Sequence, residues 1–169
     1  MRAALALAAE AGRAGEVPVG AVVVHQGCIV GRGANRQIAD RDPTAHAEIV
    51  ALREAARKLG HHRLPRATIY CTLEPCAMCA GALVNARLER LVFGSRDVRF
   101  GAVRSKYHLA DSEFLNHRLE IVEGVLAGAC LAPLRAFFAA RRQPAGSGFL
   151  DRELASADSI DKADRLPKE

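Results

Sequence analysis

Short apolar segments alternate along this chain with longer segments of helical composition. Four of the apolar segments are rich in β-branched residues and bounded by turn residues, which predicts strands over residues 17–24, 28–31, 67–72 and 91–94. Gln26 and Gly27 are expected to form the turn between the first two strands. A weaker segment at residues 120–123 predicts a fifth strand at an edge of the sheet.

The segments between the strands are rich in Ala, Leu, Glu and Arg, which are good helix formers. They predict an opening helix that ends near Ala14 and further helices over residues 44–59, 76–86 and 126–142, with Gly60 ending the second. Residues 34–43 and 95–118 are polar and read as loops, the latter with a short helical piece near Tyr107. Strands that alternate with helices predict a layered α/β sandwich.

The 169 residues are enough for one domain, which we expect over residues 1–150. Residues 151–169 are polar and aperiodic, and predict a mobile tail. No apolar run is long enough to cross a bilayer, so no membrane partner is expected. The five cysteines are odd in number and unevenly spaced, which favours a reducing, cytoplasmic compartment over a disulfide framework.

The chain carries a net charge of +5. Residues 151–169 contain six acidic and four basic residues, so the rest of the chain carries about +7. A basic body of this kind is consistent with a polyanionic partner. Because basic surfaces are common, the charge is informative only beside a chemical motif.

Two short motifs carry that chemistry: His-Ala-Glu at residues 46–48 and Pro-Cys-Ala-Met-Cys at residues 75–79. Together they offer one imidazole and two thiols, from His46, Cys76 and Cys79, which suit a zinc ion with an open fourth position. Glu48 is the spare carboxylate. A carboxylate beside zinc-activated water takes the proton of that water and passes it on, which suits hydrolytic removal of an amino group from an electron-poor ring carbon.

The predicted structure supports this interpretation. Cys76 and Cys79 are three residues apart at a predicted helix start, where both sulfurs share one face and the free N–H groups favour thiolate. His46 also lies near a helix start. If the two strand–helix units are neighbours in one sheet, these helix starts meet at the edge where open α/β sheets bind their ligands.

A structural zinc site is the main alternative. Cys71, Cys76, Cys79 and His46 have the composition of a closed cage of three cysteines and one histidine, which would bind zinc without catalysis. Cys28, Cys71 and Cys130 are otherwise read as small buried apolar residues. Glu48 separates the catalytic from the structural interpretation, because a closed cage has no zinc-bound water whose proton a carboxylate could take.

These motifs resemble the zinc-dependent nucleobase deaminase superfamily, whose signature is H-x-E followed by P-C-x-x-C. Within the superfamily, the closest resemblance is to the bacterial tRNA-specific adenosine deaminases. It covers the chain from about residue 16 to residue 142 and rests on EVPVGAV at 16–22, DPTAHAE at 42–48, TLEPCAMCAGA at 72–82, FGSRD at 93–97 and NHR at 116–118.

The resemblance implies a cytidine deaminase-like fold, which is a three-layer α/β/α sandwich with a central five-stranded mixed sheet. It also implies a homodimer with one zinc ion per subunit, held by His46, Cys76 and Cys79, and proton transfer by Glu48. The implied reaction converts adenosine to inosine at the wobble position of a tRNA anticodon, above all in the arginine tRNA with anticodon ACG.

The resemblance further implies three substrate-binding residues. Asn35 would hydrogen-bond the flipped base, Val17 would pack on it, and Asp97 would lie near the sugar–phosphate of the RNA loop. Each has a simpler interpretation that stays open. Asn35 is also suited to shaping a turn, Val17 to plain core packing, and Asp97 to a surface ion pair with Arg96.

One segment departs from the family pattern. Residues 101–105 read Gly-Ala-Val-Arg-Ser, with Arg104 where the family commonly has glycine.

Deamination of a free base or nucleoside, such as guanine, cytosine or cytidine, is the competing function, because the same zinc site attacks the equivalent carbon of each. The basic body and the tRNA-enzyme segments favour RNA.

Overall fold

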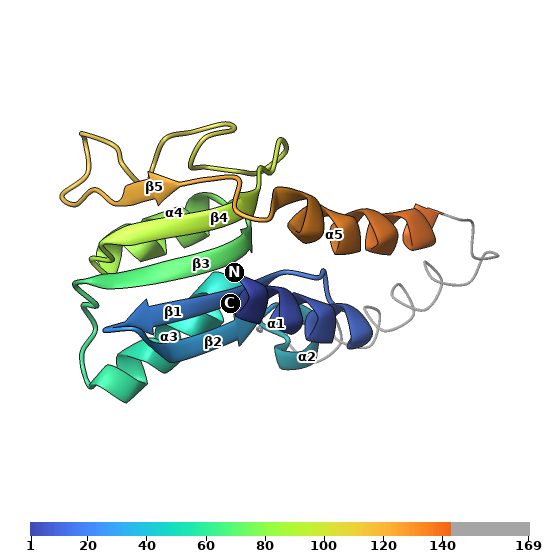
Figure 1. The fold of residues 1–169 in the computed structure, drawn as a ribbon, viewed down its shortest axis with the longest axis horizontal. Coiled ribbons are helices and arrows are strands. Elements are labelled where there is room, and N and C mark those ends of the chain that lie inside the picture. The colour runs from blue at the N-terminus through green and yellow to red at the C-terminus, as the bar shows by residue number, and fades with distance from the viewer. Residues whose placement is uncertain (143–169) are drawn as a thin grey trace, which may run out of the picture. The chain divides into compact units, whose positions relative to one another are not determined.

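A five-stranded mixed sheet lies at the centre of the structure, a computed structural model that describes residues 1–142 (Figure 1). Its strands are β1 (Gly20–His25), β2 (Cys28–Ala34), β3 (Ala67–Leu73), β4 (Arg90–Ser95) and β5 (Glu120–Val122), in the order β2-β1-β3-β4-β5. β1 is antiparallel to both of its neighbours, whereas β3, β4 and β5 are parallel. The mixed five-stranded sheet and the edge position of β5 are therefore confirmed.

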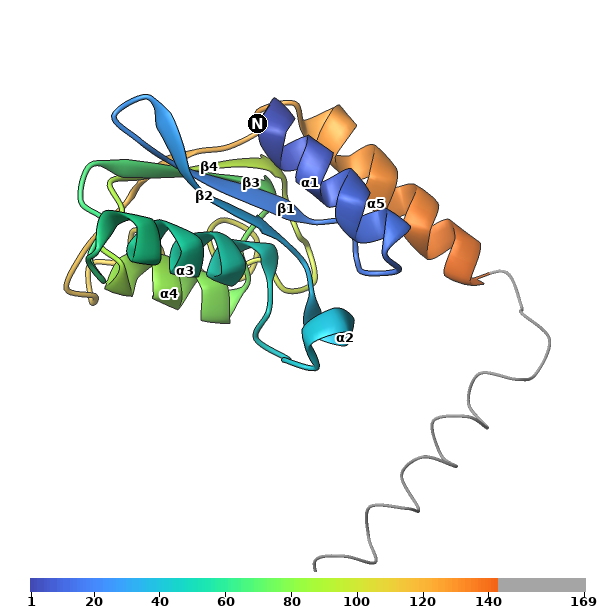
Figure 2. The same ribbon diagram turned by 90° about the horizontal axis from the view of Figure 1, so that it is seen from below.

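Helices cover both faces of this sheet. They are α1 (Arg2–Arg13), α2 (Gln37–Asp40), α3 (Ala47–Leu59), α4 (Ala77–Asn85) and α5 (Ala127–Arg142). Figure 2 shows α3 and α4 together on one face and α1 on the other. This arrangement confirms the three-layer α/β/α sandwich. The described helices include none with the length and apolar character that a membrane span requires.

Close approach of helix to sheet depends on two strand glycines that face opposite sides. A Cβ atom on Gly20 would lie 2.1 Å from the carbonyl oxygen of Ala4 in α1, and one on Gly33 would lie 1.9 Å from that of Ala47 in α3. Neither backbone carbonyl can move without moving its helix, so only glycine fits. Gly33 thereby brings the start of α3 directly against β2.

Several elements differ from the prediction, and β2 runs on to Ala34 rather than ending at residue 31. β1 begins at Gly20 rather than at residue 17, because Pro18 has no N–H to donate to a neighbouring strand. α3 begins at Ala47 rather than at residue 44, and residues 102–105 form turns where a helical piece near Tyr107 was predicted. The four-residue α2 lies in the segment predicted as a loop.

Residues Met1–Phe137 form one compact unit, and a second unit begins at Phe138. The predicted domain over residues 1–150 extends past the described part of the chain. The predicted tail over residues 151–169 lies wholly outside it.

Candidate active site

The two zinc-binding motifs meet at the edge of the sheet where β3 ends. His46 is the N-cap residue of α3 and Cys76 is the N-cap residue of α4, while Cys79 lies in the first turn of α4. The ligand atoms of these three residues all lie within 4.8 Å of one another. The expected meeting of two helix starts at one edge is therefore observed.

The separations within this cluster fit a zinc ion. Nδ1 of His46 lies 3.7 Å from Sγ of Cys76 and 3.6 Å from Sγ of Cys79. A tetrahedral zinc ion with ordinary bond lengths separates a nitrogen and a sulfur ligand by about 3.6 Å. Cys71 is buried within β3 and is not part of the cluster found among the described residues, so the geometry offers three ligands rather than a closed cage.

The site favours negative charge on one sulfur. Hydrogen bonds from Cys79 and His46 lower the pKa of the Cys76 thiol to about 4, although burial opposes this. The pKa of Cys79 is raised because it donates to Cys76 and is buried. The hydrogen bond to Cys76 also raises the pKa of His46. The His46 ring nitrogen is within hydrogen-bond distance of both cysteine sulfurs. A metal ion that binds here displaces the protons that these side chains hold between them.

Glu48 lies in the first turn of α3, two residues after His46, and is only 3% exposed. Burial raises the pKa of its carboxyl group. Its Oε2 atom is buried with no hydrogen-bond partner, the one such side-chain atom in the described part of the chain. A buried carboxylate oxygen without a partner is costly, and here it lies beside a metal-binding cluster. Both properties suit a proton carrier whose partner is the substrate.

Asn35, at 6% exposed, directly follows β2 and bonds to the His-Ala-Glu segment. Its side-chain Oδ1 accepts a hydrogen bond from the backbone N–H of Ala47 at 2.9 Å. The backbone N–H of Asn35 donates to the carbonyl of Val19 at 3.2 Å. Among residues 1–142, no acceptor is found for its side-chain Nδ2 donor. Asn35 therefore shapes the site, as its simpler interpretation expected, and still has a donor to offer a ligand.

The other two predicted substrate-binding residues have different surroundings. Val17 is half-buried and packs against the hydrophobic core. Asp97 accepts hydrogen bonds at Oδ1 from the N–H groups of Arg99 and Phe100, at 2.9 and 3.2 Å. Arg96 pairs with Glu123 at 2.7 Å, so the alternative ion pair between Arg96 and Asp97 is not formed.

Two buried carboxylates that shape loops of the structure were not identified from the sequence. Oε1 of Glu16 accepts hydrogen bonds from the N–H groups of Ile38 and Ala39, both at 2.9 Å, and so holds α2. Glu74 directly precedes the Pro-Cys motif and accepts hydrogen bonds from the loop over residues 97–105. In the sequence, the only signal for either residue is an acidic side chain beside apolar ones. That pattern does not indicate a hydrogen-bond partner more than twenty residues away.

Arg104, at the position where the resemblance implies a glycine, forms an ion pair. Its guanidinium donates to both carboxylate oxygens of Asp111, at 3.1 and 2.8 Å, and to the carbonyl of Val103 at 2.7 Å. Arg104 is not among the residues with positive φ, so its backbone suits any side chain. The departure therefore adds a contact within the loop without distorting it.

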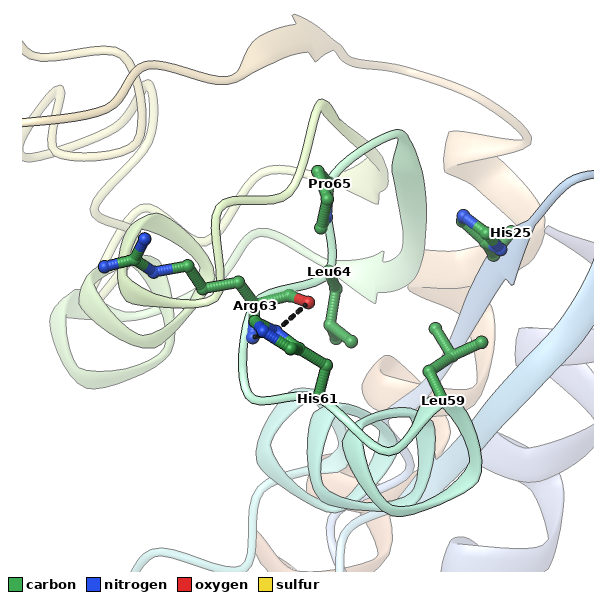
Figure 3. Close-up of a pocket in the computed structure, with 6 residues that line it drawn as sticks. All are labelled: His25, Leu59, His61, Arg63, Leu64 and Pro65. Atoms are coloured by element: carbon green, nitrogen blue, oxygen red, sulfur yellow. Dashed lines mark hydrogen bonds between the residues drawn. The ribbon is translucent and has the colours of Figure 1, made fainter.

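A separate cavity of about 350 Å³ lies at the opposite edge of the sheet (Figure 3). It is beside His25, which ends β1 and pairs with Ala67 at the start of β3. Leu59, His61, Arg63, Leu64 and Pro65 complete its lining. None of the zinc-site residues borders this cavity, so it is not part of the candidate active site.

Comparison with known proteins agrees with this geometry. Residues 1–95 match the cytidine and deoxycytidylate deaminase zinc-binding region. A tRNA-specific adenosine deaminase from Haemophilus influenzae is 50% identical over 85% of this chain and 83% of its own length. The corresponding protein from Bacillus subtilis is 44% identical over 82% of this chain and 86% of its own length.

Solved structures give the same result. A structure from a study of A-to-I editing by tRNA:A34 deaminases at the wobble position of transfer RNA has a TM-score of 0.77 and 41% identity, covering 79% of this chain and 97% of that one. A guanine deaminase from Nitrosomonas europaea has a TM-score of 0.70 and 28% identity, covering 80% and 81%. This chain therefore belongs to the cytidine and deoxycytidylate deaminase family and, within it, to the bacterial tRNA-specific adenosine deaminases.

Proposed function

We propose that this protein hydrolytically deaminates adenosine to inosine at the wobble position of a tRNA anticodon. The observation that carries the proposal is the buried, unpartnered Oε2 of Glu48 beside the His46, Cys76 and Cys79 cluster. This arrangement supports hydrolytic deamination, and the 50% identity to a tRNA-specific adenosine deaminase supports tRNA as the substrate. The net reaction consumes one water molecule and releases ammonia.

His46, Cys76 and Cys79 are proposed to hold one zinc ion through Nδ1 and the two Sγ atoms. When bound there, zinc activates a water molecule for attack at neutral pH. Glu48 then moves protons at Oε2. Its carboxylate takes a proton from the attacking water, delivers it to the ring nitrogen next to the reacting carbon, and assists the departure of ammonia. The raised pKa of Glu48 suits a group that must both accept and donate a proton.

Three residues are proposed to position the base. Nδ2 of Asn35 donates to an acceptor nitrogen of the flipped adenine, while its Oδ1 stays bonded to Ala47. Val17, half-buried at the core boundary, packs on the base. Asp97 lies near the sugar–phosphate and shapes the turn that contacts it, because its Oδ1 accepts hydrogen bonds from the N–H groups of Arg99 and Phe100.

The finer assignments extend this proposal. The arginine tRNA with anticodon ACG is the proposed substrate, and a homodimer in the cytoplasm is the proposed working form. Residues 1–150 are the proposed catalytic domain. Deamination of a free base is less well supported, since the guanine deaminase comparison reaches only 28% identity against 50% for the tRNA enzyme.

A substrate panel tests the proposal. The purified protein is offered an ACG anticodon stem-loop RNA, free adenosine, cytidine and guanine, and products are identified by mass. Inosine in the RNA alone is expected, with the Glu48→Ala protein as the inactive control. Ammonia from a free base or nucleoside with the RNA unchanged would keep the zinc chemistry and overturn the RNA substrate.

A further inference from the structure

The loop over residues 96–107 exposes large apolar side chains beside the zinc site. Val98 is 73% exposed, Phe100 is 70% exposed and Tyr107 is 61% exposed. Exposed aromatic rings are the groups on which unpaired bases stack.

The backbone of this loop is joined to the zinc-binding segment. Gly101 forms an isolated antiparallel bridge with Cys76, and the N–H of Ala102 donates to the carbonyl of Pro75 at 2.9 Å. Phe100 is therefore one residue away from backbone that pairs with a proposed zinc ligand.

Glu74 holds the loop in this position. Its carboxylate, 2% exposed, accepts hydrogen bonds from the N–H groups of Asp97 at 3.0 Å, Val103 at 3.1 Å, Arg104 at 2.6 Å and Ser105 at 2.8 Å. The hydroxyl of Ser105 donates to it as well. A Cβ on residue 101 would lie 2.4 Å from this carboxylate, so the glycine permits the approach. The loop is thus preformed rather than free to collapse.

The charges on the loop complement a phosphate backbone. Arg96 and Arg104 are paired with Glu123 and Asp111. Arg99 and Lys106 are exposed, and neither has an ion-pair partner among residues 1–142. Two unpaired cations that flank exposed aromatic rings are the combination found on surfaces that bind single-stranded nucleic acid.

We propose that Phe100 stacks on the unpaired nucleotide next to the target adenosine, and that Glu74 is the positioning residue that holds the loop for this contact. The inference rests on the proposed function and deepens it by naming how the flanking nucleotide is held. Arg99 and Lys106 neutralise phosphates on either side. Stacking on an aromatic ring accepts any base, so this contact sets affinity more than sequence preference.

A binding experiment with the Glu48→Ala protein tests the contact without turnover. The probe is the anticodon stem-loop RNA with 2-aminopurine on one side or the other of the target adenosine, since stacking quenches its fluorescence. Phe100→Tyr is expected to keep the quenching and Phe100→Leu to lose it, with a roughly tenfold weaker Kd for Phe100→Leu. Phe114→Leu, which alters another exposed ring, is the matched control and is expected to bind normally.

Kinetics on the otherwise wild-type enzyme test the role of Glu74. Phe100→Leu and Glu74→Gln are expected to raise KM for the RNA several-fold with kcat nearly unchanged and zinc content intact. Glu74→Gln is also expected to speed trypsin cleavage after Arg99, because the loop is released. Ser105→Ala, which removes only the hydroxyl contact, gives a milder version if Glu74→Gln fails to fold.

The outcomes separate the two proposals. If the wild-type enzyme edits no RNA, the proposed function fails. If it edits RNA but Phe100→Leu shows the same Kd and the same fluorescence quenching as Phe100→Tyr, the proposed stacking contact is overturned and the proposed function stands. Equal losses in Phe100→Leu and Phe114→Leu would also overturn the assignment to Phe100.

Discussion

The side-chain Oδ1 of Asn35 accepts a hydrogen bond from the backbone N–H of Ala47 at 2.9 Å. Ala47 separates His46 from Glu48, so this one bond fixes the start of α3 between a proposed zinc ligand and the proposed proton carrier. It also fixes the amide of Asn35. With Oδ1 engaged, the group left for a substrate is the Nδ2 donor, which decides how the base is oriented.

Asn35→Asp separates the two roles of this side chain. Aspartate keeps an oxygen for the N–H of Ala47 but has no donor for the base. We expect KM for the RNA to rise about tenfold while the thermal midpoint stays close to that of the wild type. Asn35→Ala loses both roles and is expected to lower stability by about 1 kcal/mol as well, because the helix start loses its acceptor. An Asn35→Asp enzyme with normal KM would restrict Asn35 to a structural role.

Removing the carboxylate of Glu48 should separate chemistry from metal binding. Both Glu48→Gln and Glu48→Ala are expected to retain zinc, since Glu48 is not in the three-residue cluster, and to lower kcat by at least about a hundredfold. Zinc content by atomic emission and single-turnover rates on the stem-loop RNA measure the two effects. Loss of the metal instead would identify Glu48 as a ligand.

The cysteines divide into ligands and core. Burial raises the pKa of Cys71 well above its usual value, so it remains a neutral thiol within β3. Cys71→Ser is expected to leave zinc content unchanged at a modest cost in stability, whereas Cys79→Ser is expected to deplete the metal. The same metal assay on both proteins decides this. Depletion in Cys71→Ser would revive the closed cage.

The sequence predicts the zinc cluster well because its signals are local. Composition and turn residues predict helix starts near residues 44 and 76, within three residues of the observed N-caps His46 and Cys76, and strand–helix alternation brings them to one edge if the two units are neighbours. The surroundings of the site depend on distant contacts instead. α2 exists because Glu16 binds its N–H groups from 22 residues away, and the loop after β4 is shaped by Glu74. Neither bond leaves a periodic pattern in the chain.

The ion pair between Arg104 and Asp111 predicts a pH-dependent stability. A hydrogen bond from Arg104 lowers the pKa of Asp111 below its usual value of 3.8. A depressed pKa in the folded state stabilises the fold above 3.8, and the contribution is lost as the pH falls through the folded-state pKa. Asp111→Asn is therefore expected to be about 1 kcal/mol less stable at pH 7.

Denaturant unfolding across the acid range checks this expectation. The difference between wild type and Asp111→Asn should be full at pH 7, shrink as the pH falls below 3.8 and vanish below the folded-state pKa, where the carboxyl group is neutral in the folded and unfolded states. Arg96–Glu123, a more exposed pair, is the control, and Glu123→Gln should cost less. A difference independent of pH would show that packing rather than charge stabilises the loop.

The position of editing is measured by mapping inosine in a full-length arginine tRNA with anticodon ACG. The transcript carries adenosines at many positions, and reverse-transcription sequencing identifies each one that is converted. We expect inosine at the wobble position alone, in a zinc-dependent reaction that is absent with Glu48→Ala. Conversion spread over several adenosines, or an unmodified wobble position beside an active zinc-loaded enzyme, would contradict it.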